Sequence, residues 1–312
     1  MAVSGSKNYS ITRADIIESA YRKTGEFDQG ESIGGDETTA GAMALNLFVK
    51  YLVTRGADIW LRDEVTLFLQ PDTQLYAWGT DHFTRSYVGT TLSAAEASGQ
   101  TVISVTLSTG MTAADYIGIK MDDNTIHWST IASVDSSTQV TIDDATDDDA
   151  ASGNQVYTYT TKAVRPIKIV SAFRRDTSDI DTPVAVIGEA DYRMQSSKGS
   201  SGPPTEVWYQ PTLSTGSLYV WPVDGGASVD KLSFSAQYYP DDFDAANDNP
   251  QFPIEWGEAL VYGLADRLAA ELGNMTIKER GFLRLEAAEK IEDALNFDTE
   301  NASVIFSLDD RR

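Results

Sequence analysis

The chain has 312 residues, a formal net charge of −23 and no cysteine. Its length allows about two domains, and its share of hydrophobic residues is high enough to fill real cores. The absence of cysteine excludes disulfides and thiol catalysis, and two histidines, His82 and His127, leave little for a zinc site. Binding to the phosphates of a nucleic acid requires clustered lysine and arginine, so the acidic excess argues against a nucleic-acid-binding protein.

We expect neither a membrane span nor a secretion signal. No run of about 18 apolar residues occurs, and the opening MAVSGSKNYS lacks an apolar core. We therefore expect the chain to be made and folded in a cytoplasm.

Residues 1–63 predict a helical hairpin. Thr12 and Asp15 have the spacing of a capping box at the start of the first helix, which runs through Lys23. Gly25 follows as the expected C-terminal stop.

The second helix of this hairpin is longer. Asp36 is its predicted N-cap, and Gly56 is its predicted end. Its predicted buried face consists of Met43, Ala44, Leu47, Phe48, Tyr51 and Leu52.

From Glu64 the hydrophobic period changes from that of a helix to that of a strand. The runs EVTLFLQ and LYAWG, with a turn at Pro71 and Asp72 between them, predict a β-hairpin. The later runs are expected to be antiparallel neighbours because their connections are short: RPIKIVSAFRR, TPVAVI, EVWYQ, SLYVW and VDKLSFSAQYY. Residues 64–86 and 163–250 thus predict one antiparallel β-sheet domain.

Residues 87–162 have a different character, with short runs rich in Thr, Val, Ile and Ser between Gly and Asp turns. The segment contains ten acidic residues against Lys120 and Lys162. The candidate strands are TVISV, YIGIK, IHWSTIA, QVTI and QVYTYTT. They predict a small barrel or sandwich inserted into the larger sheet, independently folded and facing outward.

Residues 251–298 predict a second helical hairpin. Pro253 suits its first helical position, Gly273 ends the first helix, and Thr276 with Glu279 forms the capping box of the second. Its apolar stripe is predicted to serve helical packing or a subunit interface: Trp256, Leu260, Gly263, Leu264 and Leu268.

Neither hairpin can bury its stripe alone. We therefore predict an α+β protein in which the N- and C-terminal hairpins form a discontinuous four-helix unit. Residues 299–312 are predicted to be an extended C-terminal arm. Its apolar triplet and basic end are candidates for docking on another protein: Val304, Ile305, Phe306, Leu308, Arg311 and Arg312.

Several residue clusters have alternative interpretations. Asp143, Asp144, Asp147, Asp148 and Asp149 could bind calcium, but no glycine falls where an EF-hand loop requires one, so a solvated turn is preferred. The pair Asp241 and Asp242 could serve glycoside hydrolysis, although nothing selects that pair among many acids.

Two further clusters could bind ligands. The basic cluster Arg165, Lys168, Arg174 and Arg175 is expected to make ion pairs rather than to contact nucleic acid. Six aromatic residues could stack on sugars, with core packing as the default: Trp208, Tyr209, Tyr219, Trp221, Tyr238 and Tyr239. We predict no catalytic residue, no cofactor and no metal site.

The order of elements resembles a known family. The segments ITRADIIESAYRKTG, RGADIWLRDEVTLFLQ, GSLYVWPVDGG and FPIEWGEALVYGLADRLAAELG look like those of head-to-tail adaptor proteins of short-tailed bacteriophages, the tail tubular protein A type. The resemblance covers nearly the whole chain, and none of its motifs is catalytic.

This resemblance implies a structural virion protein. It implies a ring, usually of twelve copies, between the portal and the tail nozzle, with a channel for the genome and a C-terminal tail that reaches the portal. Tail fibres are a further expected contact, and DNA is expected to pass without specific binding. The alternatives are a virion-associated peptidoglycan or glycan hydrolase and a sugar-binding tail module.

Overall fold

The computed structural model describes residues 9–27, 30–57, 59–176, 178, 180–226 and 231–298. It is a mixed α+β structure, as predicted, and it divides into two compact units. We call residues 1–61 and 239–312 the helical unit, because the helices at both ends of the chain belong to it. Residues 62–238 form the sheet unit.

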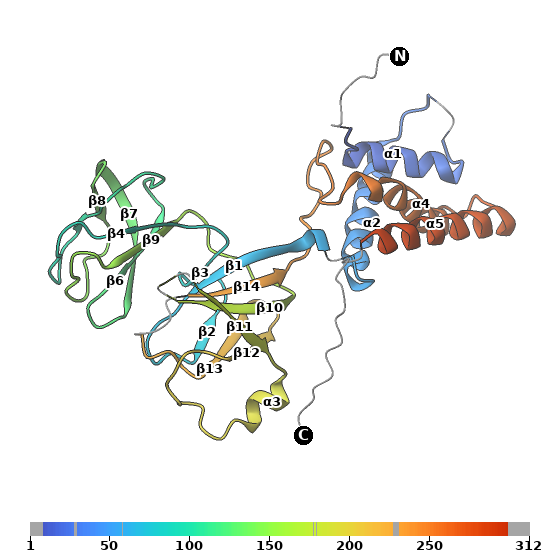
Figure 1. Cartoon of the computed structure of the whole chain (residues 1–312). Helices are drawn as coiled ribbons and strands as arrows, with labels where there is room; N and C mark the ends of the chain where they lie inside the picture. Colours follow the sequence, from blue (N-terminus) through green and yellow to red (C-terminus); the bar gives the residue numbers. More distant parts are fainter. Residues whose placement is uncertain are drawn as a thin grey trace, which may run out of the picture. The chain divides into compact units, whose positions relative to one another are not determined.

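The helical unit is built around four long helices (Figure 1). They are α1 (Arg13–Thr24), α2 (Gly35–Thr54), α4 (Gly257–Leu272) and α5 (Ile277–Phe297), with short 3₁₀ turns η1 (Ile59–Leu61) and η2 (Ile254–Trp256). Helix α4 packs against α1, α2 and α5. It therefore joins the two ends of the chain.

The predicted helix boundaries are mostly confirmed by the caps. Thr12 and Thr276 both form complete capping boxes, with Asp15 and Glu279 as their partners. These side chains satisfy backbone N–H groups that a helix start leaves unpaired. Gly25 ends α1 and Gly273 ends α4, both in the left-handed conformation that glycine adopts without strain.

Two boundary predictions were wrong by a few residues. The N-cap of α2 is Gly34, so Asp36 lies inside the first turn, where its charge still complements the helix dipole. The predicted stop at Gly56 is confirmed, because the helix ends at Thr54 with Arg55 as its C-cap and Gly56 follows with a φ of 103°. Pro253 precedes the 3₁₀ turn η2, and the α-helical part begins only at Gly257.

One apolar core fills the helical unit, and all four long helices contribute to it. Its fully buried members include Ile16 and Ile17 of α1, Leu45 and Leu52 of α2, and Trp256 from η2. Helix α4 contributes most: Ala259, Leu260, Val261, Leu264, Ala265, Leu268 and Ala269. Segments that lie far apart in the sequence thus bury each other's apolar surface.

The predicted buried face of α2 was only half right. Phe48 and Leu52 are buried, but Met43, Leu47 and Tyr51 are exposed by 65%, 62% and 44%. The helix instead buries Gly41, Leu45, Phe48, Val49, Leu52 and Val53. Helix α2 carries apolar residues on two arcs, and sequence spacing alone did not show which arc faces the core.

The sheet unit contains an eight-stranded sheet with the order β2-β13-β12-β11-β10-β14-β1-β3. Its strands are β1 (Arg62–Phe68), β2 (Leu75–Ala77), β3 (Phe83–Thr84), β10 (Lys168–Arg175), β11 (Asp181–Val186), β12 (Glu206–Pro211), β13 (Gly216–Trp221) and β14 (Lys231–Gln237). A short helix, α3 (Glu189–Met194), follows β11 and had no counterpart in the sequence prediction.

Strand pairing corrects the predicted topology in three places. The expected hairpin between β1 and β2 does not form, because β1 pairs with β14 and β3 while β2 pairs with β13. Strands β11 and β12 are parallel rather than antiparallel. Strands β13 and β14 follow each other in the chain but are not neighbours in the sheet. The pairs β10 with β11 and β12 with β13 are antiparallel, as predicted.

Within the segment 87–162 the chain forms a second sheet of six strands, ordered β4-β9-β6-β7-β8-β5. They are β4 (Val88–Thr91), β5 (Val102–Ser104), β6 (Tyr116–Lys120), β7 (Ile126–Ser136), β8 (Gln139–Ile142) and β9 (Gln155–Tyr159). A bridge between Leu92 and Val105 joins the two edges. The sheet therefore curls around a core of its own.

A leucine in the middle of α4 tests the helical core. Leu264 is fully buried, so Leu264→Ala should lower the free energy of unfolding by about 2 to 5 kcal/mol through lost burial and a residual cavity. Leu285→Ala on α5 is the matched control, because Leu285 is 68% exposed. Urea denaturation of both variants provides the measurement. Equal stability losses would contradict the assignment of Leu264 to the core.

Two helical glycines should respond oppositely to the same substitution. A Cβ at Gly263 of α4 would clash with the Phe48 ring, whereas a Cβ at Gly281 of α5 would meet nothing within 4 Å. Gly263→Ala should therefore destabilise by about 1 to 3 kcal/mol through overpacking. Gly281→Ala should stabilise by about 0.5 to 1 kcal/mol, because alanine loses less backbone entropy. Thermal melting of the pair checks the sign; stabilisation by both would refute the close approach of α2 and α4.

Candidate functional site

The five residues predicted for helical packing or a subunit interface lie in the core of the helical unit. Trp256, Leu260 and Leu264 are fully buried, Leu268 is nearly so, and Gly263 lies against Phe48. Contacts within the subunit bury these five residues. They therefore cannot form a contact surface for another protein, and other faces of the helical unit are the candidates.

One candidate is the outward face of α2. Met43, Leu47 and Tyr51 recur every four residues and so form one exposed stripe, which we call the α2 stripe. Beside it lies an open hollow of about 370 Å³, lined by Asp36, Thr39, Ala40, Met43, Ala44, Leu47 and Glu271. At the other end of the stripe the guanidinium of Arg267 lies 5.2 Å from the centre of the Tyr51 ring. The sequence spacing had indicated these three residues, but as part of the core.

The second candidate is the outward face of α5. Ile277, Phe282 and Leu285, which we call the α5 stripe, are exposed by 95%, 59% and 68%. They lie away from the buried positions Leu283 and Ala287. The first turns of this helix also carry Lys278, Arg280 and Arg284. The sequence contained a signal for this face, because these three apolar residues fall off the stripe that α5 buries.

Exposed apolar residues that lie close together on one face of a helix are candidates for a protein contact surface. The C-terminal arm had been expected to supply such a surface as well. The predicted portal-docking residues Val304, Ile305, Phe306, Leu308, Arg311 and Arg312 lie outside the described residues. The two stripes are therefore the candidate contact surfaces of the described chain.

The carboxylate pair considered for glycoside hydrolysis is engaged in structural contacts. Asp242 forms an ion pair with Lys50 at 2.9 Å. The Asp241 carboxylate accepts a hydrogen bond from the Gln251 side-chain amide at 2.6 Å, and its backbone N–H donates to the same side chain at 2.8 Å. These bonds hold both carboxylates in the connection that leads to α4.

The carboxylates of the acidic run from Asp143 to Asp149 point to different partners. Asp143 accepts a hydrogen bond from Thr130, Asp147 contacts the His127 ring at 2.7 Å, and Asp149 accepts from the backbone N–H of Ser98 at 2.8 Å. Among the residues that the structure describes, no three His, Asp or Glu side chains are grouped to hold a metal ion. The run serves as the predicted turn.

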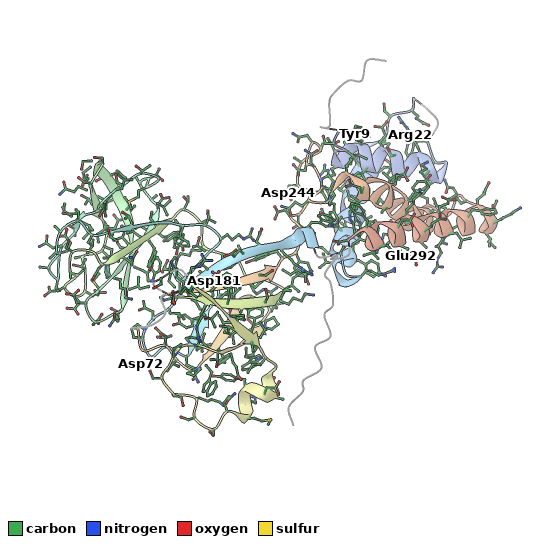
Figure 2. All side chains as sticks on the ribbon, in the orientation of Figure 1. Tyr9, Arg22, Asp72, Asp181, Asp244 and Glu292 are labelled. Carbon is green, nitrogen blue, oxygen red and sulfur yellow. The ribbon has the colours of Figure 1, made fainter. Side chains whose placement is uncertain are left out.

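The basic cluster of the large sheet is used within the subunit. Arg175 makes a two-pronged ion pair with Asp181 at 2.7 and 2.8 Å, and Asp181 is marked in Figure 2. This bond lowers the pKa of the Asp181 carboxyl. Arg165 and Arg174 donate to the backbone carbonyls of Thr212 and Pro204. The expected ion pair is therefore present at Arg175, whereas Arg165 and Arg174 bond to the backbone instead.

The aromatic residues of the large sheet mostly cover one another. Trp208 is buried and stacks on Tyr219 with ring centres 4.6 Å apart, and Tyr192 packs against both. Tyr209 and Tyr238 are held in or against the sheet core. The default of core packing is confirmed for Trp208, Tyr209 and Tyr238, whereas Tyr239 is exposed by 46%.

Comparison with known proteins adds no relative: no family model and no curated protein sequence matches the chain. None of the helices in the described part of the chain is long and apolar enough to cross a lipid bilayer.

The six-stranded sheet packs against a strand of the eight-stranded sheet. Phe68 of β1 is fully buried among Ile126, Tyr157 and Tyr159 of the small sheet. Its ring centre lies 4.4 Å from that of Tyr157. From the sequence we had expected no buried partner for this segment because of its charge. The charge lies on its turns, whereas the surface that meets β1 is aromatic.

A histidine lies at this aromatic contact. His82 is half-buried, and its Nδ1 accepts a hydrogen bond from the indole N–H of Trp128 at 3.1 Å. Acceptance at Nδ1 requires the neutral ring. Burial lowers the pKa of His82 below its usual value of 6.5, although nearby Asp81 opposes the shift.

This shift predicts a loss of stability in mild acid. Below about pH 6.5, His82 binds a proton in the unfolded chain but stays neutral in the folded protein. The free energy of unfolding is therefore highest above that pH, and it falls as the pH drops toward the lowered pKa of the folded state. Urea unfolding of the wild type should therefore be easier at about pH 5.5 than at about pH 7.5.

His82→Gln is the matched control, because its side-chain oxygen can still accept from Trp128 but does not titrate. Its difference in unfolding free energy between the two pH values should be smaller than that of the wild type. An equal pH dependence in both proteins would rule out His82 as the source.

Proposed function

We propose that the chain is a structural virion protein, the head-to-tail adaptor of a short-tailed bacteriophage. Copies of it form a ring, with twelve as the expected number, that joins the portal to the tail nozzle. The ring surrounds part of an acidic channel through which DNA passes during packaging and ejection. It is assembled in the host cytoplasm and resides in the connector of the virion, and we propose no enzymatic activity for it.

The observation that carries this proposal is the surface of the helical unit. Its core is complete, yet α2 and α5 still present exposed apolar stripes. Apolar residues that lie close together on one exposed face can mark a contact surface for another protein. A protein that works as an assembly needs them as contacts between copies or with neighbouring rings.

The proposal includes an arrangement of the four long helices. We take α1, α2, α4 and α5 as a discontinuous four-helix unit that unfolds as one body and forms the ring. The sheet unit is then a second part of each subunit, and we propose that its small sheet contacts tail fibres or other tail parts. The shared apolar core of the four helices supports this assignment.

The acidic excess of the chain is consistent with a wall that surrounds passing DNA. With 47 acidic against 24 basic residues, a wall made of this protein repels the phosphates of passing DNA. Weak adhesion is what a conduit requires, because each tight contact would slow ejection. Several of the basic residues that could oppose this are engaged, as the ion pairs of Arg175, Lys50 and Lys162 illustrate.

Negative-stain imaging tests the function directly. The purified chain, mixed with portal rings, should give a ring with an open centre on one face of the portal, and the ring should bind duplex DNA only weakly at physiological salt. Monomers that ignore the portal, or rings that bind duplex DNA tightly, would contradict the proposal. Turnover of purified cell wall, abolished by one carboxylate substitution, would favour the hydrolase alternative instead.

The C-terminal arm provides a second prediction. Its Val304, Ile305 and Phe306 are apolar and favour an extended strand, and Arg311 and Arg312 end an acidic chain with positive charge. Truncation after Asp298 should leave the melting temperature nearly unchanged but weaken binding to portal rings at least tenfold, measured by sedimentation. A control in which only Arg311 and Arg312 are replaced by Ser separates charge from strand pairing. Full portal affinity of the truncated chain would exclude the arm as the docking element.

A further inference from the structure

We infer that the two sheets of the sheet unit are held in one orientation by a joint that opens and closes as a whole, and that Gln70 is the residue that positions the small sheet in it. The joint consists of the contacts between residues 87–162 and the rest of the sheet unit. The small sheet has a core of its own, so without such contacts it could turn on its connections. A fixed joint holds any partner of the small sheet at one place relative to the large sheet. The inference does not depend on the proposed ring.

The chain enters and leaves the small sheet through two segments that pair with each other. Thr84 and Lys162 form an antiparallel bridge, and the backbone N–H of Ala163 donates to the carbonyl of Phe83 at 2.9 Å. This pairing fixes one point of the joint. A connection of only two strands can still twist, so further contacts decide whether the sheets keep one orientation.

An aromatic cluster forms the centre of the joint. The ring of Phe68, from β1, lies 4.4 Å from that of Tyr157 and 5.2 Å from that of Tyr87, measured between ring centres. Lys231 of β14 is the strand partner of Phe68, and its ammonium group lies over both tyrosine rings. This packing holds the sheets together, but burial of apolar surface is not directional. The orientation must therefore come from polar contacts.

Gln70 provides two directional bonds across the joint. Its side-chain amide donates to the carbonyl of Ile126 at 2.8 Å, and its side-chain oxygen accepts from the backbone N–H of Ile126 at 2.9 Å. Ile126 is the first residue of β7 and is buried. Because hydrogen bonds are directional, two bonds between one amide and one residue restrict rotation as well as separation.

The large sheet holds the backbone of Gln70 in turn. Its N–H donates to the hydroxyl of Tyr76 at 2.8 Å, and the same hydroxyl donates to its carbonyl at 3.1 Å. Tyr76 is buried in the core of the large sheet. The side chain of Gln70 therefore extends from a fixed point, which a residue needs if it is to position a neighbouring sheet.

The turn between β6 and β7 makes a second contact beside Gln70. A Cβ added to Gly226 would lie 2.7 Å from the Cβ of Asn124 and 2.8 Å from the Cγ of Pro71. The ammonium group of Lys120, at the end of β6, donates to the carbonyl of Gly226 at 3.4 Å. The backbone of the large-sheet loop thus approaches this turn as closely as only glycine allows.

Two further bonds cross the joint at the loop between β2 and β3. The indole N–H of Trp128 donates to Nδ1 of His82 at 3.1 Å, and the hydroxyl of Tyr159 donates to the carbonyl of Asp81 at 2.6 Å. Both donors belong to the small sheet, and neither bond involves Gln70. The Trp128 indole can therefore report whether the joint opens as a whole.

Hydrogen exchange of the Trp128 indole N–H, followed by NMR, tests the role of Gln70. Gln70→Ala leaves the polar groups of buried Ile126 without their side-chain partner, so it should speed this exchange about tenfold, because one opening exposes all bonds of the joint. Trp128→Phe identifies the signal. Backbone amides in the middle of β14 should stay protected, which separates opening of the joint from unfolding.

Gln74→Ala is the matched control. The side-chain amide of Gln74 donates to the carbonyl of Lys198 at 3.0 Å, a bond that does not involve the small sheet. This variant should leave the exchange of the Trp128 indole unchanged. Gln70→Glu retains the size of the side chain and its acceptor but cannot donate to Ile126 when ionised, so it should also speed the exchange. It decides the result if Gln70→Ala fails to fold.

Distances between two spin labels measure the orientation itself, because the chain has no cysteine of its own. One double variant carries Ser137→Cys in the small sheet and Leu213→Cys in the large sheet, both at exposed turn positions. The reference pair, Leu213→Cys with Met194→Cys, lies outside the small sheet and is also exposed. We expect distance distributions of similar width, and about twofold broadening of the first pair alone when Gln70→Ala is added.

Two results would overturn the inference. A distribution across the joint that is already broad in the chain with Gln70, and that Gln70→Ala does not widen, would show that the sheets move independently. Faster exchange at the Ile126 amide with an unchanged Trp128 indole would show that Gln70 makes a local bond and that the joint does not open as a whole.

Discussion

The packing of α4 against α1, α2 and α5 is the interaction on which the rest of the structure depends. Two chain ends, separated by the whole sheet unit, bury each other's apolar residues around this helix. Gly263 allows the Phe48 ring to approach the α4 backbone closely, which draws α2 onto the core. The core of the helical unit therefore consists of residues from both ends of the chain, on either side of the sheet unit.

The same packing determines which apolar residues of α2 and α5 remain exposed to solvent. Helix α2 has apolar residues on two arcs and α4 can cover only one, so Met43, Leu47 and Tyr51 stay in solvent. Helix α5 buries few of its residues and leaves Ile277, Phe282 and Leu285 exposed. We propose that these exposed apolar residues make contacts with other subunits or with neighbouring rings in the assembled particle.

The sequence predicted the helices well and the sheet topology poorly, for physical reasons. Capping boxes such as Thr12 with Asp15 are local, so their spacing alone revealed the helix starts. Strand order is not local: β1 pairs with β14 across most of the sheet unit, and no turn residue records that choice. The two arcs of α2 could not be ranked because both have helical spacing. The contact of Phe68 with the small sheet was missed because composition reports charge on turns, not the aromatic surface between strands.

The central claim is that one arc of α2 stabilises the subunit and the other joins it to its neighbours. The measurement that tests it most directly combines urea unfolding and sedimentation on portal rings for Leu47→Glu. We expect an unchanged unfolding midpoint, because Leu47 is 62% exposed, together with loss of assembly through an unpaired charge in an apolar contact. A large drop in stability, or rings that assemble as the wild type does, would contradict it.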